Sequence, residues 1–294
     1  MSWASKLAKP YRVDDGEKIR LKDFDPSDTG DIRSKEHATE LLETGIAHMA
    51  ELQNKLYAQD RWGVLLILQA MDAAGKDGAI KHVMSGINPQ GCQVYSFKTP
   101  STEELNHDYL WRTMQRVPER GHIGIFNRSY YEEVLVVRVH QDLLKTERIP
   151  DSLITKDLWE ERFRDICAFE RYFSHNGIVI RKFFLHLSKQ EQKRRFLERL
   201  DQPEKNWKFS ASDVREREYW DDYMDAYEDM IRNTSTKHSP WFVIPADNKW
   251  FTRLVLAAAI VDTLDDLDLS YPKVDAQKRK ELQAARRMLS GRGK

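Results

Sequence analysis

Apolar residues along this chain fall into short runs typical of β-strands and longer stretches with helical spacing, and the two kinds alternate. The runs that we interpret as strands occupy residues 64–68, 92–97, 122–127, 178–187 and 241–245. The helices that we expect around them occupy residues 35–59, 76–85, 101–116, 155–175, 213–234 and 248–267, with one more beginning at Ser188. Strands that alternate with helices predict an α/β fold with a parallel central sheet.

The two ends of the chain lack this regularity. Residues 1–34 are polar, contain prolines and glycines and show no sustained period, so we expect an extended arm with one short strand at 19–21. The tail, residues 271–294, is basic, and we expect a frayed helix there. Because no repeat or low-complexity linker interrupts residues 35–270, we predict a single domain between the arm and the tail.

The first predicted strand leads into a loop, Ala-Met-Asp-Ala-Ala-Gly-Lys-Asp-Gly at residues 70–78, and then into a helix. This is the layout of a phosphate-binding loop: Gly75 and Gly78 let backbone N–H groups approach an anion, the helix presents its positive end, and Lys76 adds a mobile charge. The loop departs from the G-x-x-x-x-G-K-[ST] pattern at Ala70 and at Asp77, which replaces a Mg²⁺-binding hydroxyl. The alternative is an ordinary turn with a solvated lysine.

Polar side chains at the ends of two predicted strands support the phosphate site. Asp72 and Asp77 would repel an anion unless a divalent cation lay between them, so their presence favours a site that includes Mg²⁺. The strand at 122–127 ends in Asn127 and is followed by Arg128 and the start of another helix. Because the carboxyl ends of parallel strands meet at one edge of the sheet, we expect Asn127 and Arg128 to face the phosphate loop.

The segment from residue 189 to 217 is dense in basic side chains. They are Lys189, Lys193, Arg194, Arg195, Arg199, Lys205, Lys208, Arg215 and Arg217. A solvated helix face is the ordinary interpretation of such a run. Because it follows a late strand in a domain with a phosphate loop, we favour a lid that closes over phosphates and excludes water.

Composition narrows the classes of protein. The 47 basic and 47 acidic residues cancel, so no overall field attracts nucleic acid or a membrane surface. Cys92 and Cys167 are too few for a disulfide framework or a zinc site. No apolar run has the length of a membrane span or a signal peptide, and we therefore expect a cytoplasmic protein without membrane or nucleic-acid partners.

Several motifs read together resemble the polyphosphate kinase 2 family. They are MDAAGKDG at 71–78, FNRSYYE at 126–132, PEKNWKF at 203–209, TST at 234–236 and WFVIPA at 241–246, with FDP at 24–26 in the arm. The resemblance covers approximately residues 10–270. It implies a three-layer α/β/α P-loop kinase fold of the thymidylate-kinase type with a helical lid at 189–217. It also implies reversible phosphoryl transfer between inorganic polyphosphate and a nucleotide, with Mg²⁺, or alternatively Mn²⁺, as the cofactor.

The resemblance also implies roles for particular residues. Those implied for catalysis are Asp72, Lys76, Asp77 and Arg128, with Asp72 as the metal ligand. Those implied for phosphate and nucleotide binding are Ala73, Ala74, Gly75, Gly78, Asn127, Ser129, Tyr131, Glu132 and Glu133. Those implied for holding the polyphosphate chain are Lys81, Lys193, Arg194, Arg199 and Lys208.

Asn127 stands where many members of the family have an aspartate before Arg-Ser. Together with Glu132 and Glu133, it resembles the subgroup that phosphorylates nucleoside monophosphates as well as diphosphates. We therefore expect AMP and ADP as acceptors, and GMP and GDP as further candidates. The two glutamates have an alternative interpretation as solvent-facing residues favoured by a helix N-terminus.

Two other functions stay open on the sequence alone. A nucleotide-hydrolysing switch would need a hydroxyl after Lys76, which is absent. A polyanion-binding protein could use the basic lid and tail, although the balanced charge and the lack of a recognised motif speak against nucleic acid. For the transferase we expect a homo-oligomer, either a dimer or a tetramer.

Overall fold

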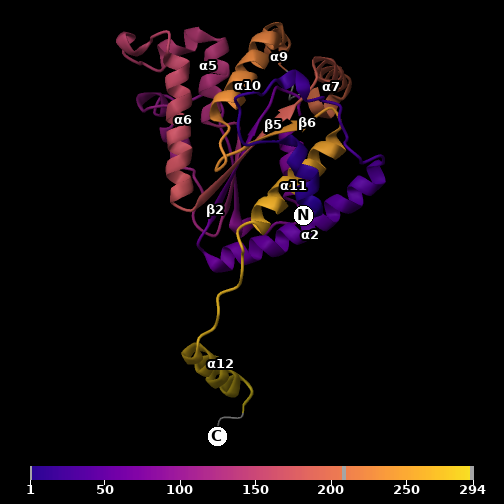
Figure 1. The fold of residues 1–294 in the computed structure, drawn as a ribbon, viewed down its shortest axis with the longest axis vertical. Coiled ribbons are helices and arrows are strands. Elements are labelled where there is room, and N and C mark those ends of the chain that lie inside the picture. Colours follow the sequence, from indigo (N-terminus) through magenta and orange to yellow (C-terminus); the bar gives the residue numbers. More distant parts are fainter. Residues whose placement is uncertain (1, 207–209, 292–294) are drawn as a thin grey trace.

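The computed structural model describes residues 2–206 and 210–291, and within them a sheet of six strands has helices on both faces (Figure 1). The strands are β1 (Arg12–Val13), β2 (Gly63–Gln69), β3 (Cys92–Ser96), β4 (Ile123–Asn127), β5 (Ile178–His186) and β6 (Trp241–Pro245). The helices are α1 (Trp3–Ala8), α2 (Lys35–Gln59), α3 (Lys76–Val83), α4 (Trp111–Met114), α5 (Val136–Val139), α6 (Leu158–His175), α7 (Lys189–Asp201), α8 (Pro203–Asn206), α9 (Ala211–Glu216), α10 (Trp220–Thr234), α11 (Lys249–Asp265) and α12 (Ala276–Leu289).

The order of strands in the sheet is β1-β6-β5-β2-β4-β3. Strands β3, β4, β2, β5 and β6 run parallel, while β1 pairs antiparallel with β6 at one edge. The predicted parallel sheet and α/β fold are therefore confirmed. Because β2 lies between β4 and β5, the loop that follows it stands in the middle of the edge where the carboxyl ends of the parallel strands gather.

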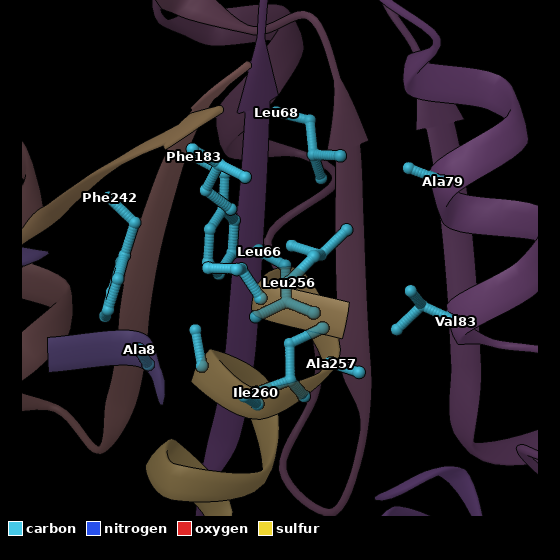
Figure 2. Packing of buried hydrophobic residues seen from close by; sticks show 14 of the residues in the cluster. Ala8, Leu66, Leu68, Ala79, Val83, Phe183, Phe242, Leu256, Ala257 and Ile260 are labelled. Atoms are coloured by element: carbon cyan, nitrogen blue, oxygen red, sulfur yellow. The ribbon is translucent and has the colours of Figure 1, made fainter. Parts of the chain in front are cut away.

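The continuous apolar run in β2 reflects burial on both faces of the sheet. Successive side chains point to opposite faces, so Val64, Leu66 and Leu68 join one core cluster while Leu65 and Ile67 join the other. The first cluster packs under α1, α2, α3 and α11, and Figure 2 shows part of it. The second packs under α6 and α10. The sheet is thus held between two helical layers, which fixes the loops at its carboxyl edge.

Most predicted elements are found where the apolar pattern placed them. The predicted helices at 35–59, 155–175 and 248–267 correspond to α2, α6 and α11, and the predicted strands correspond to β2 through β6. Ser188 caps α7 by accepting the Glu191 N–H at 3.1 Å. The Glu191 carboxylate, however, bonds Arg194 and Arg195 instead of completing a capping box.

The predicted helix at 101–116 is wrong. Ser101 and Glu104 exchange hydrogen bonds as a cap should, but one 3₁₀ turn (Glu104–Asn106) follows and then the single turn of α4. His107 is extended, and the Asp108 carboxylate accepts the Leu110 N–H. Asn and Asp side chains compete with helical hydrogen bonds, and no apolar stripe spans this segment to hold a longer helix.

The predicted helix at 213–234 is divided into α9 and α10 by a 3₁₀ turn, Arg217–Tyr219. At this break the Arg217 side chain bonds Gln192 and the Lys189 carbonyl of α7, so a tertiary contact replaces the straight helix. The helix expected after Arg128 is also broken, into a 3₁₀ segment (Tyr130–Val134) and the short α5.

The N-terminal arm is not extended throughout, and its strand lies elsewhere than predicted. Residues 3–8 form α1 against α11, and the short strand is β1 rather than residues 19–21. The Leu21 N–H bonds Glu228 of α10 and the Ile19 carbonyl accepts from Arg232. Because these backbone groups bond to side chains of α10, they do not pair with a strand of the sheet.

Beyond α11 the chain leaves the domain as an extended segment and ends in α12 (Figure 1). Every described side chain of α12 is exposed, which agrees with a helical tail outside the domain. Within residues 2–206 and 210–291, none of the helices combines the length and the apolar character that a membrane span requires.

Candidate active site

The loop between β2 and α3 has the backbone of an anion cradle. Gly75, the N-cap of α3, has φ 102° in the left-handed region, which glycine adopts without strain. Ala73 has φ 66°, an uncommon value for a residue with a side chain. The Lys76 Nζ donates to the Ala70 carbonyl at 2.9 Å, and burial, followed by the charge of Arg128, lowers the lysine pKa to about 8. Lys76 is therefore a half-buried group folded over the loop, not a solvated one.

Arg128 links the loop after β4 to the P-loop, as the sheet topology predicts. It donates from Nη2 to Asp72 Oδ1 and from Nη1 to Glu132 Oε2, both at 2.9 Å. These carboxylates, Glu132 first, raise the pKa of Arg128 above its ordinary value. The backbone of Arg128 is left-handed, with φ 66°. The backbone conformation is the uncommon one, and the side chain that it directs lies between two carboxylates. A phosphate could replace one of these carboxylates as the partner of Arg128.

Asn127 also faces the P-loop. Its Nδ2 donates to Asp77 Oδ1 at 2.8 Å, which joins the end of β4 to the first turn of α3. An amide suits this place because it can donate to a carboxylate, whereas an aspartate would repel it.

The carboxylates near the P-loop can supply only some of the ligands of a divalent ion. Among the described residues no group of three His, Cys, Asp or Glu side chains is arranged to bind a metal ion. In the sequence, Asp72 and Asp77 stand on either side of Lys76. One oxygen of the Asp72 carboxylate is already paired with Arg128. Mg²⁺ is commonly held by one or two carboxylates together with substrate phosphates and water. The donor set therefore fits a metal that arrives with the phosphates.

Three residues expected to bind phosphate or nucleotide lie in the protein interior. Ser129 and Tyr131 are fully buried, and the Tyr131 hydroxyl donates to Glu170 at 2.7 Å. Glu133 is 5% exposed and lies beside Arg162 and Glu147, and burial, with Glu147 next, raises its pKa to about 8. Ser129 caps the 3₁₀ turn that carries Glu132, so it and Tyr131 support the site from behind. The alternative of solvent-facing glutamates is wrong for Glu133 and for the half-buried Glu132.

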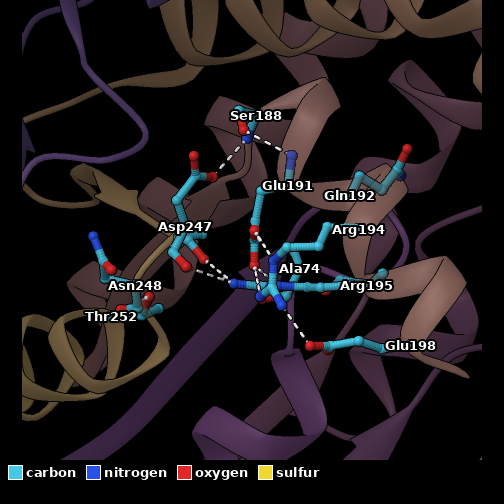
Figure 3. Close-up of polar contacts among 12 residues, drawn as sticks. Ala74, Ser188, Glu191, Gln192, Arg194, Arg195, Glu198, Asp247, Asn248 and Thr252 are labelled. Atoms are coloured by element: carbon cyan, nitrogen blue, oxygen red, sulfur yellow. Dashed lines mark hydrogen bonds and ion pairs between the residues drawn. The ribbon is translucent and has the colours of Figure 1, made fainter. Parts of the chain in front are cut away.

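Side chains of helix α7 donate hydrogen bonds to backbone carbonyls of the P-loop (Figure 3). The buried Arg195 donates to the carbonyls of Ala73 at 3.0 Å and Ala74 at 2.8 Å. Gln192 donates to the Asp72 carbonyl at 2.9 Å. Arg195 is one of the basic side chains expected on the lid, but the structure buries it beneath the P-loop.

A basic cavity of about 360 Å³ opens beside the P-loop. One wall is formed by residues 73–75, 78 and 79, and the others by Arg195, Glu198 and Arg199 of α7 with Lys249, Thr252 and Arg253 of α11. Burial, followed by Arg195, lowers the pKa of Lys249, and burial lowers that of Arg253. The described lining holds four cationic side chains and one carboxylate, that of Glu198, so its net charge is positive and suits a phosphate.

A larger and mainly apolar cavity, of about 760 Å³, lies beside Arg128 and Glu132. Its apolar walls come from the segments that follow β3 and β4: Phe97, Pro100, Leu105, Tyr109, Val136, Val137, Leu143 and Ile149. Arg112, which is 8% exposed, donates to the Lys98 carbonyl at 2.7 Å and lies over the Phe97 ring in this wall. The volume and lining suit the base and sugar of a nucleotide.

The residues expected to hold polyphosphate are not all at these cavities. Arg199 lines the basic cavity, but Lys81, Lys193 and Arg194 line neither one. Arg194 pairs with Glu191 and Glu198 on its own helix. Lys208 lies outside the described residues.

Lys249 and Arg253 are not among the site residues expected from the sequence, because the predicted helix at 248–267 contains no motif that indicates a function. A signal existed, since residues 248–253 follow the carboxyl end of the last strand, where ligand groups gather in parallel sheets.

Comparison with known proteins identifies the family of this chain. Residues 32–272 match the sequence profile described as Polyphosphate kinase 2 (PPK2). The chain is 55% identical to the ADP-polyphosphate phosphotransferase of Rhodopseudomonas palustris, over 96% of this chain and 98% of the relative. It is 45% identical to the AMP/ADP-polyphosphate phosphotransferase of Meiothermus ruber, over 92% and 98%. The crystal structure of polyphosphate kinase 2 from Arthrobacter aurescens superposes with a TM-score of 0.87 at 40% identity, over 97% of this chain and 99% of the other. The chain therefore belongs to the polyphosphate kinase 2 family.

Proposed function

We propose that this protein transfers a phosphoryl group from inorganic polyphosphate to nucleoside mono- and diphosphates, reversibly and with Mg²⁺. AMP and ADP are the acceptors we propose first, and GMP and GDP are further ones. The observation that carries the proposal is that two cavities of opposite character flank the P-loop. The basic one is built after β5 and β6 and the apolar one after β3 and β4, so they lie on opposite sides of β2 in the sheet. The names of the two relatives support polyphosphate with ADP and AMP as substrates.

The basic cavity is the proposed donor side. Arg199, Lys249 and Arg253 line it with one carboxylate, that of Glu198, while the donors of Arg195 in its wall are bound to Glu191 and to backbone carbonyls. A chain of phosphates carries a negative charge on each unit and no apolar group, and such a ligand matches a small cavity lined by cations. The P-loop at its wall would hold the phosphates next to the one transferred.

The apolar cavity is the proposed acceptor side. It has room for a nucleoside, while Arg128 and Glu132 stand where the nucleotide phosphates would reach the P-loop. A ligand with one apolar end and one anionic end would span the cavity and meet Arg128.

Phosphoryl transfer needs alignment and charge neutralisation more than a nucleophilic side chain. Lys76 and Arg128 approach the reacting centre from the P-loop and from β4, and each now binds protein oxygens that a phosphate can replace. Asp72 and Asp77 would hold Mg²⁺, which supplies further neutralisation of the phosphate oxygens when bound. The lid closing over 189–217 and a homo-oligomeric state stay predictions.

Neutralising the donor cavity should weaken polyphosphate binding selectively. With Lys249→Ala and Arg253→Ala combined, we expect KM for polyphosphate to rise about tenfold or more and KM for ADP to stay within about twofold, because a polyanion loses two cation contacts. Arg199→Ala should act in the same direction, and Arg194→Ala less, because Arg194 is already paired with Glu191 and Glu198.

The salt dependence of KM for polyphosphate provides the second readout, since fewer cation contacts release fewer counterions and flatten the dependence. Arg171→Ala, an exposed change on α6, is the control for lost charge. Equal effects of the double variant on both substrates would show that this cavity does not hold the donor.

Asn127→Asp should lower activity with AMP more than with ADP. The new carboxylate would lie at hydrogen-bond distance from Asp77 and add negative charge where the shorter acceptor must enter deepest. We expect kcat/KM to fall about tenfold for AMP and about twofold for ADP, a difference of about 1 kcal/mol in the barrier. Asn54→Asp, an exposed change on α2, controls for charge alone. An equal loss with both acceptors would remove the role given to this position.

Incubation with ADP, Mg²⁺ and polyphosphate tests the proposed function against its alternatives. A transferase forms ATP in this incubation. In a parallel incubation with ATP and no polyphosphate, a P-loop hydrolase releases orthophosphate, and a polyanion-binding protein gives neither product. ATP formation that stops when EDTA removes the metal is the expected result. Release of orthophosphate with no ATP would contradict it.

A further inference from the structure

We propose that Arg195 is a positioning residue that holds the P-loop in its phosphate-binding conformation and couples it to α7. Nothing in the comparisons assigns a role to this side chain. The inference rests on the proposed function, because the loop it holds is the one that would bind the polyphosphate donor.

All five N–H donors of the Arg195 guanidinium have partners. Nε donates to Glu191 at 2.7 Å, Nη1 to the carbonyls of Ala73 and Ala74, and Nη2 to those of Ala246 at 2.6 Å and Asp247 at 3.0 Å. The side chain is 3% exposed. Four of the five acceptors are backbone carbonyls from two separate loops, so the guanidinium joins those loops at fixed angles.

The contact with the P-loop sets the direction of its amide groups. In a planar trans peptide the C=O and the following N–H point to opposite sides. Because the carbonyls of Ala73 and Ala74 point to Arg195, and that of Asp72 to Gln192, the N–H groups of the next residues, Gly75 among them, are turned the other way. The N–H of Ala74 closes a turn on the Met71 carbonyl at 3.3 Å, and the N–H groups of Ala73 and Gly75, turned away from α7, can bind an anion.

The same guanidinium reaches the loop that begins α11. Ala246 and Asp247 precede Asn248, the N-cap of the helix that carries the cations of the basic cavity. The Asp247 carboxylate accepts the N–H of Ser188, the N-cap of α7, at 2.9 Å (Figure 3). Movement of α7 would therefore disturb the cradle and the donor cavity together.

An arginine is required by this geometry. A lysine keeps the charge but has three donors on one atom and cannot reach both loops as a planar fork. The neighbouring Arg194 shares Glu191 as a partner, but its side chain is 55% exposed and its hydrogen bonds go to carboxylates of its own helix, Glu191 and Glu198. Arg195 acts through the loop it holds and touches no reacting atom.

The test compares Arg195→Lys and Arg195→Met with Arg181→Met. Arg181 is a half-buried arginine that also donates to backbone carbonyls, those of Ile180 and His238, far along β5 from the P-loop. For Arg195→Lys we expect KM for polyphosphate to rise about tenfold, with KM for ADP within about twofold. A purely structural arginine would lower thermal stability without separating the two KM values, as we expect for Arg181→Met.

Hydrogen–deuterium exchange on the unmodified protein provides a readout that does not depend on a variant folding. With tripolyphosphate as the probe and no nucleotide, residues 70–76, 189–197 and 246–249 should gain protection together. Protection confined to residues 70–76, or equal changes in both KM values for Arg195→Lys, would overturn the inference. Failure of the unmodified protein to make ATP from polyphosphate would instead overturn the proposed function.

Discussion

Replacing Lys76 by alanine is expected to lower kcat for transfer from polyphosphate to ADP by about a hundredfold to a thousandfold. The lysine lies in the P-loop and donates to one backbone carbonyl, which a phosphate oxygen can replace as negative charge shifts in the transition state. The substitution removes one hydrogen bond from the folded protein, so the free energy of unfolding should fall little and the melting temperature should change by only a few degrees. Initial rates at saturating substrates and a thermal melt measure both.

Lys156→Ala, an exposed lysine before α6, is the matched control and should retain wild-type turnover. A folded Lys76→Ala protein with turnover within about tenfold of the wild type would mean that this loop is an ordinary strand-to-helix turn.

Arg128→Ala is expected to lower kcat by about a thousandfold, the size of effect seen for arginines that neutralise a transferring phosphoryl group. Arg128 lies between Asp72 and Glu132, so its loss also removes the cation that pairs with both carboxylates. We therefore expect a loss of stability, with a lower melting temperature, in addition to the loss of kcat.

Two further variants separate these effects. Arg128→Lys keeps a charge between the carboxylates but cannot bond both as a fork, so stability should largely return while kcat stays low. Arg138→Ala removes an ion pair between α5 and Asp229 of α10 and should leave kcat unchanged. If Arg128→Lys restored kcat to within about threefold of the wild type, Arg128 would be a structural cation only.

The central part of the site could be predicted because it depends on local pattern and simple topology. A continuous apolar run followed by small residues and Gly-Lys identifies β2 and its loop without any tertiary information. The rule that parallel strands share their carboxyl edge then brings Asn127 and Arg128 to that loop, and both bond its aspartates.

The direction of individual side chains could not be predicted in the same way. Arg194 and Arg195 are adjacent and chemically identical, yet one is exposed and the other lies beneath the P-loop, because successive residues on a helix point about 100° apart and only the packing of α7 decides which faces inward. Tyr131 belongs to a motif, 126–132, that resembles the family's and implies a role in binding. The structure buries it against Glu170 and Lys182, which are distant from it in sequence.

Cavities likewise depend on segments that no local pattern connects. The apolar cavity is formed by an irregular stretch where a helix at 101–116 was wrongly expected, together with the broken segment after Arg128. The basic cavity combines α7 with α11, whose Lys249 and Arg253 are separated from Arg199 by about fifty residues of chain. Periodicity predicts elements, but it does not predict which of their ends enclose a volume.

The most direct test of the whole account starts from AMP with Mg²⁺ and polyphosphate and no other nucleotide, and follows AMP, ADP and ATP over time. The account predicts that ADP appears first and ATP afterwards, because one acceptor cavity and one donor cavity serve both steps. ATP from added ADP with none from AMP would restrict the acceptors to diphosphates. If neither AMP nor ADP gains a phosphate from polyphosphate, the proposed assignment of the two cavities is contradicted.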